Sequence, residues 1–248
     1  MISVKSPREI EMMRVAGRIV AETLELMRES IRPGITTLEL DTIAEAHIRK
    51  SGGIPAFKGY NGFPASICSS INEQVVHGIP GSTVLNDGDI IGIDIGAVYE
   101  GYYGDAARSY GIGHIDDQLK KLLRVTEESF FAGIEYALEG NRLSDISNRI
   151  QRHVEANGFS IVRDFVGHGI GTSMHEEPQI PNYGPPSKGP RLVAGMTLAI
   201  EPMVNLGKYP VKVLKDGWTV VTADGKPSAH YENTIVVTKG RPEILTLL

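Results

Sequence analysis

Carboxylates placed inside apolar, strand-like runs constrain this sequence more than any of its other features. Asp94 lies in the run IIGIDI, Glu201 follows TLAI, and Glu232 precedes NTIVV. Taking an ionised carboxylate out of water costs several kcal/mol unless a cation or strong hydrogen bonds compensate. One such acid can be a salt-bridged structural residue, but three of them indicate a shared cation.

A fourth acid, Asp105, is expected beside Asp94. Glu100-Gly101 would be the two-residue turn of a hairpin whose strands hold the two acids. Residues opposite each other across such a turn differ by odd numbers, and side chains alternate between faces. The separation of eleven residues therefore places both carboxylates on one face, close to each other. Without Asp94, the simpler interpretation of Asp105 as an ordinary turn residue would be preferred.

Histidines in glycine-containing segments are candidates to join these acids. His168 and His175 lie seven residues apart in GHGIGTSMHEEP, and His77 precedes a glycine after an apolar run. Glycines on both sides of His168 allow backbone conformations that bring an imidazole close to a ligand. A single histidine in such a loop is weak evidence, but two that are flanked by acids are better.

One histidine with four carboxylates forms a donor set dominated by oxygen. Such a set suits Mn²⁺, Fe²⁺, Co²⁺ or Zn²⁺ better than a metal that prefers sulfur. Five donors exceed the three protein ligands of a typical catalytic zinc ion. Because carboxylates can bridge, two metal ions about 3.5–4 Å apart are the economical interpretation. Such a pair holds a hydroxide between the ions and polarises a carbonyl group.

Other polar residues near these motifs are expected to have no catalytic role. Glu176 and Glu177 are interpreted as solvated surface residues. Cys68 is disfavoured as a nucleophile because nothing nearby in the sequence activates it. His230 lies two residues before Glu232 and so on the same strand face, beside the ligands, but a structural role is the interpretation that we prefer.

Composition and charge agree with a soluble enzyme. The 248 residues fit one large domain or two fused halves, and 41% hydrophobic with 22% charged residues is ordinary. A net charge of −5 without a long run of one sign disfavours nucleic-acid binding. The single cysteine excludes an intrachain disulfide and fits a reducing compartment. Neither a signal peptide nor an apolar stretch of about eighteen residues is apparent, so a cytoplasmic protein is predicted.

The order helix, helix, strands occurs twice along the chain. Each pass occupies about half of the sequence, without a close residue-level repeat, so an internal duplication rests on element order alone and coincidence is the alternative. Packed together, the strands would form one central sheet region with helices outside and a ligand site at the junction. Ser6-Pro7-Arg8-Glu9 predicts a helix start with a capping box. The expected helices run from Ser6 to Pro33, from Thr37 to Gly52, over 117–138 and over 144–156. The expected strands lie at 65–71, 89–98 and 102–110 and from 160 onward, interrupted by a loop at 182–190.

Five motifs together resemble the type I, bacterial-type methionine aminopeptidases of the M24 metallopeptidase family. They are HGIP, the aspartate pair with ten intervening residues, GHGIG-x-x-x-HEEP, IEPM and YE-x-TIVVT, in matching order and spacing. The likeness runs from MRVAG to EILTL, and only the combination of motifs is highly specific. It implies an α+β, pseudo-twofold "pita-bread" fold with a central antiparallel sheet region, outer helices and a dinuclear metal site. The chain would be one catalytic domain, 1–248, with halves at approximately 1–110 and 115–248.

The resemblance also implies residue roles. Asp105 and Glu232 would bridge both metal ions and Glu201 would also be the general base. His175 would hydrogen-bond the scissile carbonyl as it becomes an oxyanion, and His77 would contact the peptide nitrogen that leaves as an amine. The complete ligand set would be Asp94, which completes one ion, His168 and Glu201, which complete the other, and the bridging Asp105 and Glu232.

A methionine pocket and a monovalent-cation site are implied in the same way. A thioether suits a wall of aromatic rings and sulfur. Phe57 and Met174 depart from the usual cysteine and aromatic residue, which leaves pocket size open, and without the resemblance these aromatics would be interpreted as core. The pocket residues would be Phe57, Tyr60, Phe63, Cys68, Met174 and Trp218, and the Na⁺ or K⁺ site would use Asn72, Gln74 and Ser228.

The implied substrates are nascent polypeptides that begin with methionine and carry a small second residue. The implied cofactors are two divalent ions per chain, Co, Mn, Fe or Zn. A cytoplasmic monomer that works near the ribosome, without a membrane or a specific nucleic acid as partner, is expected.

Three alternatives are less well supported by the sequence. Proline-specific peptidases of the same fold usually carry an extra N-terminal domain, whereas the first helix begins here at Ser6. Type II methionine aminopeptidases carry a long insertion, for which the 25 residues between His175 and Glu201 and the 30 between Glu201 and Glu232 leave no room. Metal-free relatives that act as binding modules would be expected to lose ligands, and all five are present.

Overall fold

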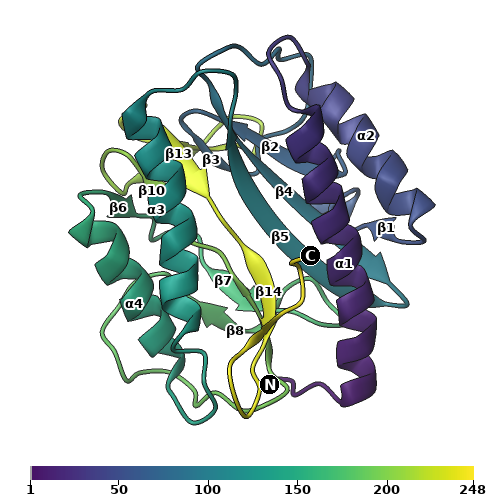
Figure 1. Cartoon of the computed structure of the whole chain (residues 1–248), viewed down its shortest axis with the longest axis vertical. Helices are drawn as coiled ribbons and strands as arrows, with labels where there is room; N and C mark the ends of the chain where they lie inside the picture. Colours follow the sequence, from purple (N-terminus) through teal and green to yellow (C-terminus); the bar gives the residue numbers. More distant parts are fainter. Residues whose placement is uncertain (1) are drawn as a thin grey trace.

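The chain folds as two helices followed by strands, and this order occurs twice, as the sequence predicts (Figure 1). The computed structural model describes residues 2–248. The helices are α1 (Pro7–Ser30), α2 (Thr37–Lys50), α3 (Asp117–Ile134) and α4 (Leu143–Ala156), with a short 3₁₀ helix η1 (Tyr60–Gly62). The strands are β1 (Ile54–Pro55), β2 (Ile67–Ile71), β3 (Gln74–Val76), β4 (Ile90–Tyr99), β5 (Tyr102–Gly111), β6 (Ser160–Ile161), β7 (Gly167–Gly169), β8 (Glu176–Ile180), β9 (Thr197–Ile200), β10 (Met203–Asn205), β11 (Val211–Val213), β12 (Val220–Thr222), β13 (Ser228–His230), β14 (Asn233–Val236) and β15 (Glu243–Ile244).

Local signals in the sequence set the ends of most helices. The N-cap hydroxyl of Ser6 accepts from the N–H of Glu9, and the Glu9 carboxylate accepts from the N–H of Ser6, which is the expected capping box. The prediction for α3 is wrong at its C-terminus, because the helix ends at Ile134 rather than at residue 138. There the chain tightens into i→i−3 hydrogen bonds that turn Ala137 into the core.

The β4–β5 hairpin confirms the geometry expected for the two aspartates. Its turn residues, Glu100 and Gly101, both have positive φ, 48° and 81°, as a two-residue turn with the twist of a hairpin requires. Asp94 lies opposite Ala107 and Asp105 lies opposite Gly96. The two carboxylates are therefore diagonal neighbours on one face of the hairpin.

The described strands form four sheets, and every strand pairing in them is antiparallel. Each half has its own core, with α1 and α2 over the strands of the first half and α3 and α4 over those of the second (Figure 1). The sheets have the strand orders β1-β4-β2 with β5 added to β4, β13-β10-β6, β11-β12-β3 and β15-β14-β9-β7-β8.

The halves meet where β5 runs beside the residues that lead into β14, and we call this junction the seam. Ala107 and Glu232 exchange two backbone hydrogen bonds, at 3.3 and 2.9 Å. The Thr234 hydroxyl donates to the carbonyl of Asp105 at 2.9 Å and accepts from its N–H at 3.1 Å. The seam therefore brings Asp105 of the first half next to Glu232 of the second.

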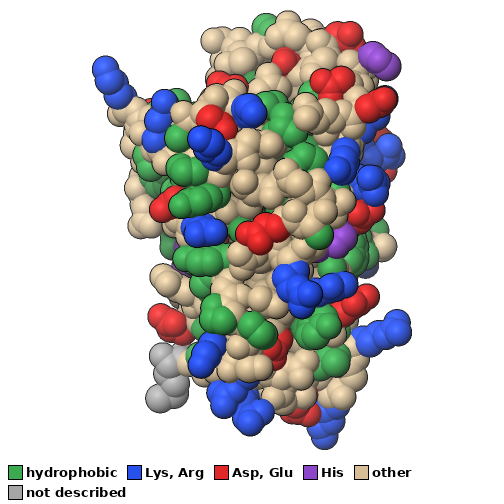
Figure 2. Space-filling view, turned by 90° about the vertical axis from the view of Figure 1, so that its left-hand side faces the viewer, with side chains coloured by type: hydrophobic (Ala, Val, Ile, Leu, Met, Phe, Trp, Pro, Cys, Tyr) green, Lys and Arg blue, Asp and Glu red, His purple; other side chains and the backbone are tan. Residues whose placement is uncertain are grey.

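The surface carries no strong concentration of one charge on the face drawn in Figure 2, where basic and acidic side chains are interspersed. Within residues 2–248, none of the helices combines the length and the apolar character that a membrane crossing needs.

Candidate functional site

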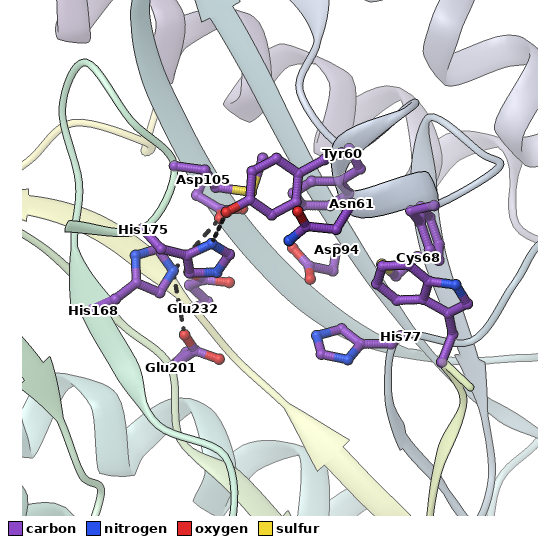
Figure 3. A pocket seen from close by; sticks show the side chains of 14 residues that line it. Tyr60, Asn61, Cys68, His77, Asp94, Asp105, His168, His175, Glu201 and Glu232 are labelled. Carbon is purple, nitrogen blue, oxygen red and sulfur yellow. Dashed lines mark hydrogen bonds and ion pairs between the residues drawn. The ribbon is translucent and has the colours of Figure 1, made fainter. Parts of the chain in front are cut away.

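A cavity of about 240 Å³ at the seam collects side chains from both halves of the chain (Figure 3). The cavity is lined by every residue that we predict from the sequence to be catalytic, metal-ligating or methionine-binding. It is also lined by Asn61, which we do not predict from the sequence. The lining residues are Phe57, Tyr60, Asn61, Phe63, Cys68, His77, Asp94, Asp105, His168, Met174, His175, Glu201, Trp218 and Glu232.

Buried strands hold the five expected metal ligands in place. Asp94 lies in β4, Asp105 in β5 and His168 in β7, whereas Glu201 and Glu232 follow β9 and precede β14. Because β9 pairs with both β7 and β14, the ligands of the second half converge. The apolar residues of these strands fill the cores, which fixes the strand register and aims the acids at the cavity.

His168 has the tautomer that binding of a metal ion through Nε2 would need. The Nδ1–H of His168 donates to the carbonyl of Gly169 at 2.9 Å, which leaves the lone pair on Nε2. That Nε2 atom lies 3.6 Å from Oε1 of Glu201 and 3.9 Å from Oδ2 of Asp105. Burial lowers the pKa of His168 to about 4, so the ring is neutral at neutral pH.

The four acids have raised pKa values, and three of them have buried oxygen atoms without hydrogen-bond partners in the described part of the chain, which a bound cation would compensate. Burial raises the pKa of Asp94 to about 7, and burial together with neighbouring carboxylates raises the pKa values of Asp105, Glu201 and Glu232 well above their ordinary range. Among residues 2–248, Oδ1 of Asp94, Oδ1 of Asp105 and Oε1 of Glu232 find no hydrogen-bond partner although they are buried. A set of oxygen donors with free lone pairs suits a divalent cation better than it suits a neutral ligand.

Two other histidines border the cavity without joining the acids directly. The Nδ1 atom of His175 lies 2.7 Å from the hydroxyl of Tyr60, at the exposed mouth. His77 has a positive φ of 60°, a conformation that is uncommon for residues other than glycine, and its ring packs edge-on against Phe165 and Trp218. Burial lowers the pKa of His77 to about 4.

The apolar end of the cavity is a single packed cluster. Phe57, Phe63, Cys68 and Met174 are each less than 8% exposed, and Tyr60 and Trp218 pack against them. The pKa of Cys68 is raised well above its ordinary value, mainly by burial and then by the charge of Asp94, so its thiol is not a nucleophile.

The residues nominated for a monovalent cation lie outside the cavity, around the turn between β2 and β3. The N–H of Ser228 donates to the carbonyl of Asn72 at 2.8 Å, so these two residues are brought together across the halves. The Gln74 side chain instead accepts from the N–H of Ile71 at 2.9 Å, within the turn itself.

The interpretation of Glu176 as a solvated surface residue is wrong. Its Oε1 atom accepts from the N–H groups of Thr172 and Ser173, at 2.9 and 3.3 Å. Its Oε2 atom lies 2.5 Å from Nζ of Lys5, and the Lys5 side chain is only 3% exposed. Glu176 therefore ties the loop that carries Met174 and His175 to the N-terminal segment.

This ion pair leads to a testable expectation. We expect Lys5→Met to lower kcat by about tenfold at nearly unchanged metal content, because removing one partner of a buried pair leaves Glu176 uncompensated and loosens its loop. Peptide hydrolysis and metal analysis on one preparation measure both quantities. The matched control is Lys58→Met, which breaks a pair with Glu45 whose lysine is 45% exposed. Equal kcat values for the two variants would contradict the expectation.

Two further residues were not assigned to the site from the sequence. Asn61 reaches the cavity from η1, and the dipeptide Asn61-Gly62 signals only a turn. His230, for which we preferred a structural role, lies with Nε2 at 3.7 Å from Oε2 of Glu201 and 3.8 Å from Oε2 of Glu232. Its position two residues before Glu232 was the available signal.

Known proteins resemble this chain over its whole length. The family model of metallopeptidase family M24 matches residues 11–239. Methionine aminopeptidase of Clostridium perfringens is 62% identical over 248 residues, which is all of both chains. Methionine aminopeptidase 1 of Bacillus subtilis is 61% identical over 246 residues, 99% of each chain. A crystal structure of methionine aminopeptidase from Thermotoga maritima has a TM-score of 0.99 at 49% identity, with both chains fully covered.

Proposed function

This chain belongs to metallopeptidase family M24 and shares the pita-bread fold and the activity of its methionine aminopeptidases, and we propose that the acids at its seam hold two divalent metal ions for that activity. The observation that carries the proposal is the convergence of four buried carboxylates and one correctly tautomeric histidine, with oxygen atoms left unpaired. Asp94, Asp105, His168, Glu201 and Glu232 are the proposed ligands. Co²⁺, Mn²⁺, Fe²⁺ and Zn²⁺ all suit these donors.

The proposed reaction is hydrolysis of the first peptide bond. When bound, the two ions supply an activated water and polarise the scissile carbonyl. The Glu201 carboxylate takes a proton from the attacking water and delivers it to the departing amine. His175 donates from Nε2–H to the oxygen that becomes negatively charged, and His77 orients the nitrogen that leaves.

The apolar cluster is proposed to receive the methionine side chain. Aromatic rings, Met174 and the buried Cys68 thiol form a wall that suits a polarizable thioether. The Phe57 ring packs directly over Gly96 of β4. A side chain at that position would exclude the ring, because a Cβ atom on Gly96 would lie 2.7 Å from it. Tyr60, Asn61 and His175 border the exposed mouth, which favours a small second residue in the substrate.

Tyr60 is proposed to set the tautomer of His175 as well as to line the pocket. If its hydroxyl donates to Nδ1, the proton of the imidazole lies on Nε2, where the developing oxyanion needs a donor. We expect Tyr60→Phe to lower kcat by up to about tenfold, the value of one net hydrogen bond, with little change in KM. Steady-state kinetics on a Met-Gly peptide measure both. A rise in KM alone would assign Tyr60 to the pocket wall only.

Three finer assignments complete the proposal. Both halves contribute ligands, so residues 1–248 would act as one catalytic domain, and the donors of a single chain suffice for a monomer. Na⁺ or K⁺ would bind at carbonyls near Asn72, Gln74 and Ser228. The substrates would be polypeptides emerging from the ribosome in the cytoplasm, where chains begin with methionine.

The decisive experiment measures release of free methionine from Met-Gly and Met-Leu peptides. Metal-stripped protein is compared with protein to which Mn²⁺, Fe²⁺, Co²⁺ or Zn²⁺ is restored, and a Xaa-Pro peptide is included. The proposal expects metal-dependent release that favours glycine at the second position. Cleavage of the Xaa-Pro peptide alone would move the chain to the proline-specific peptidases. Absence of cleavage with every metal would leave a binding module as the better description.

A further inference from the structure

His230 is buried at the seam, and among residues 2–248 the Nε2 atom of its ring has no hydrogen-bond partner. The residue as a whole is 3% exposed. Such isolation is unusual for a buried polar atom. It distinguishes His230 from a structural core histidine, which would be expected to bond a neighbour through both nitrogens.

The backbone of His230 is fixed, so the position of the ring is not accidental. The hydroxyl of Ser109 donates to the His230 carbonyl at 2.9 Å and accepts from its N–H at 2.9 Å. His230 also pairs with Met203 across β10 and β13. These contacts join His230 to both halves of the chain and aim its imidazole at the acids.

The distances around His230 match those around the expected ligand His168. Nε2 of His230 lies 3.7 Å from Oε2 of Glu201 and 3.8 Å from Oε2 of Glu232. Nε2 of His168 lies 3.6 Å from the other oxygen of Glu201 and 3.9 Å from Asp105. These separations are too long for hydrogen bonds. Two atoms that bind one metal ion at about 2.1 Å lie about 3.0 to 3.4 Å apart, so an ion would need to draw these side chains together by only a few tenths of an ångström.

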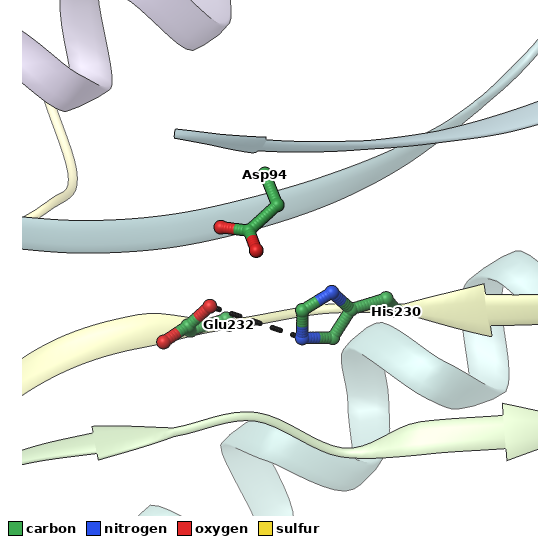
Figure 4. Close-up of side chains that lie close together, drawn as sticks. All are labelled: Asp94, His230 and Glu232. Atoms are coloured by element: carbon green, nitrogen blue, oxygen red, sulfur yellow. Dashed lines mark ion pairs between the residues drawn. The ribbon is translucent and has the colours of Figure 1, made fainter. Parts of the chain in front are cut away.

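The donors fall into two groups that share Glu232, and each group has one imidazole. One group is Asp105, His168 and Glu232, and the other is Asp94, His230 and Glu232, with the donor atoms of each group within 4.8 Å of one another. Figure 4 shows the His230 ring facing the carboxylates of Asp94 and Glu232. The second group resembles the first in both chemistry and spacing.

We propose that His230 is a sixth metal ligand, which gives the ion on the Asp94 side an imidazole donor equivalent to His168. The inference rests on the proposed two-ion function of the seam. Four carboxylates already neutralise two divalent ions, so a further donor should be uncharged, as a buried imidazole is. Imidazole also favours Co²⁺, Fe²⁺ and Zn²⁺ over Mn²⁺, so His230 would bias the choice of the second ion.

The alternative role for His230 is that of a hydrogen-bond donor that merely orients Glu201. Two variants separate these roles, because glutamine keeps an N–H donor at the end of its side chain and leucine does not. A ligand role predicts that His230→Gln and His230→Leu both weaken the second ion. A donor role predicts that His230→Gln binds like the wild type and only His230→Leu is impaired.

The experiment titrates the metal-free, full-length protein with Co²⁺ and separately with Mn²⁺ in a calorimeter. We expect both variants to lose at least about tenfold in affinity for the second Co²⁺, less for the second Mn²⁺, and almost nothing for the first ion. The matched control is His47→Gln, because His47 also lies 3.8 Å from a carboxylate, that of Glu22, but far from the seam in sequence and on the surface helix α2.

A readout on the wild type alone guards against misfolded variants. Proton NMR of the Co²⁺-loaded protein should show one paramagnetically shifted imidazole N–H after the first equivalent and a second one after the second equivalent. Unchanged second-site affinity in His230→Gln, or a single shifted imidazole at full loading, would overturn the inference. If the wild type binds fewer than two ions or releases no methionine, the proposed function fails instead.

Discussion

Glu201→Gln is expected to lower kcat by about 10²- to 10⁴-fold while the protein still binds metal ions. The amide keeps an oxygen atom that can ligate, but it cannot take a proton from water and deliver it to the leaving amine, and a positioned acid–base group contributes this factor. KM should change little, since the substitution leaves the residues of the proposed methionine pocket unchanged. Glu201→Ala should abolish turnover and also weaken metal binding, because both the base and the ligand are lost.

The measurement is steady-state hydrolysis of a Met-Gly peptide together with metal analysis of the same sample. Glu177→Gln is a matched control, because Glu177 belongs to β8 near the site but is exposed. Near-normal kcat in Glu201→Gln at full metal content would remove Glu201 from the role of base. A loss of kcat in strict proportion to lost metal would leave Glu201 as a ligand only.

Asp94→Asn is expected to lower the activity of the enzyme but to raise the stability of the metal-free protein. Loss of a ligand should lower kcat by roughly 10²- to 10³-fold, since several kcal/mol of transition-state stabilisation depend on the metal ions. The metal-free variant should nevertheless unfold less easily than the metal-free wild type at neutral pH. Asparagine is neutral at every pH, so the variant does not bury an acid that water would ionise.

The pH dependence follows from the raised pKa of Asp94. In the metal-free folded protein the pKa of Asp94 is about 7, against 3.8 for the free side chain, so between these values the folded state holds a proton that the unfolded state has released. The stability of the metal-free wild type therefore falls as pH rises from about 4 to about 7, by no more than about 4 kcal/mol for this group. The slope should be shallower in Asp94→Asn.

Urea unfolding of the metal-free proteins at about pH 4 and about pH 7 tests this expectation. Asp117→Asn is the control, because the Asp117 side chain is 98% exposed. A steeper pH slope in Asp94→Asn than in the wild type would contradict the raised pKa of Asp94. Adding Co²⁺ should reverse the ranking, because ions that bind the folded state stabilise it by an amount that grows with the logarithm of their affinity, and the wild type should bind them more tightly than the variant.

Periodicity, caps and turn chemistry were enough to predict most of the fold. The capping box at Ser6 and the hairpin turn at Glu100-Gly101 are signals that depend only on nearby residues, and both are confirmed. The facing positions of Asp94 and Asp105 then follow from the alternation of side chains along a strand. The end of α3 was missed because burial of Ala137, a tertiary effect, decides where that helix stops.

The site was predictable where chemistry and local pattern coincide. An acid inside an apolar strand is recognisable in a sequence because its burial needs a cation. The role of Glu176 is different, since it depends on Lys5, 171 residues away, and no local pattern reports that contact. Asn61 likewise reaches the cavity through the packing of distant segments, which no local pattern reports. The spacing of two residues from Glu232 did indicate the position of His230 but not its unpaired Nε2 atom.

The proposed metal ligands are divided between the two halves of the chain, which has a consequence for when activity can begin. Each half has its own core, but Asp94 and Asp105 come from one half, and His168, Glu201 and Glu232 come from the other. If these five residues hold the metal ions, a chain that is still being synthesised carries no complete set of ligands. Peptide-bond cleavage would then begin only after the two halves have packed together.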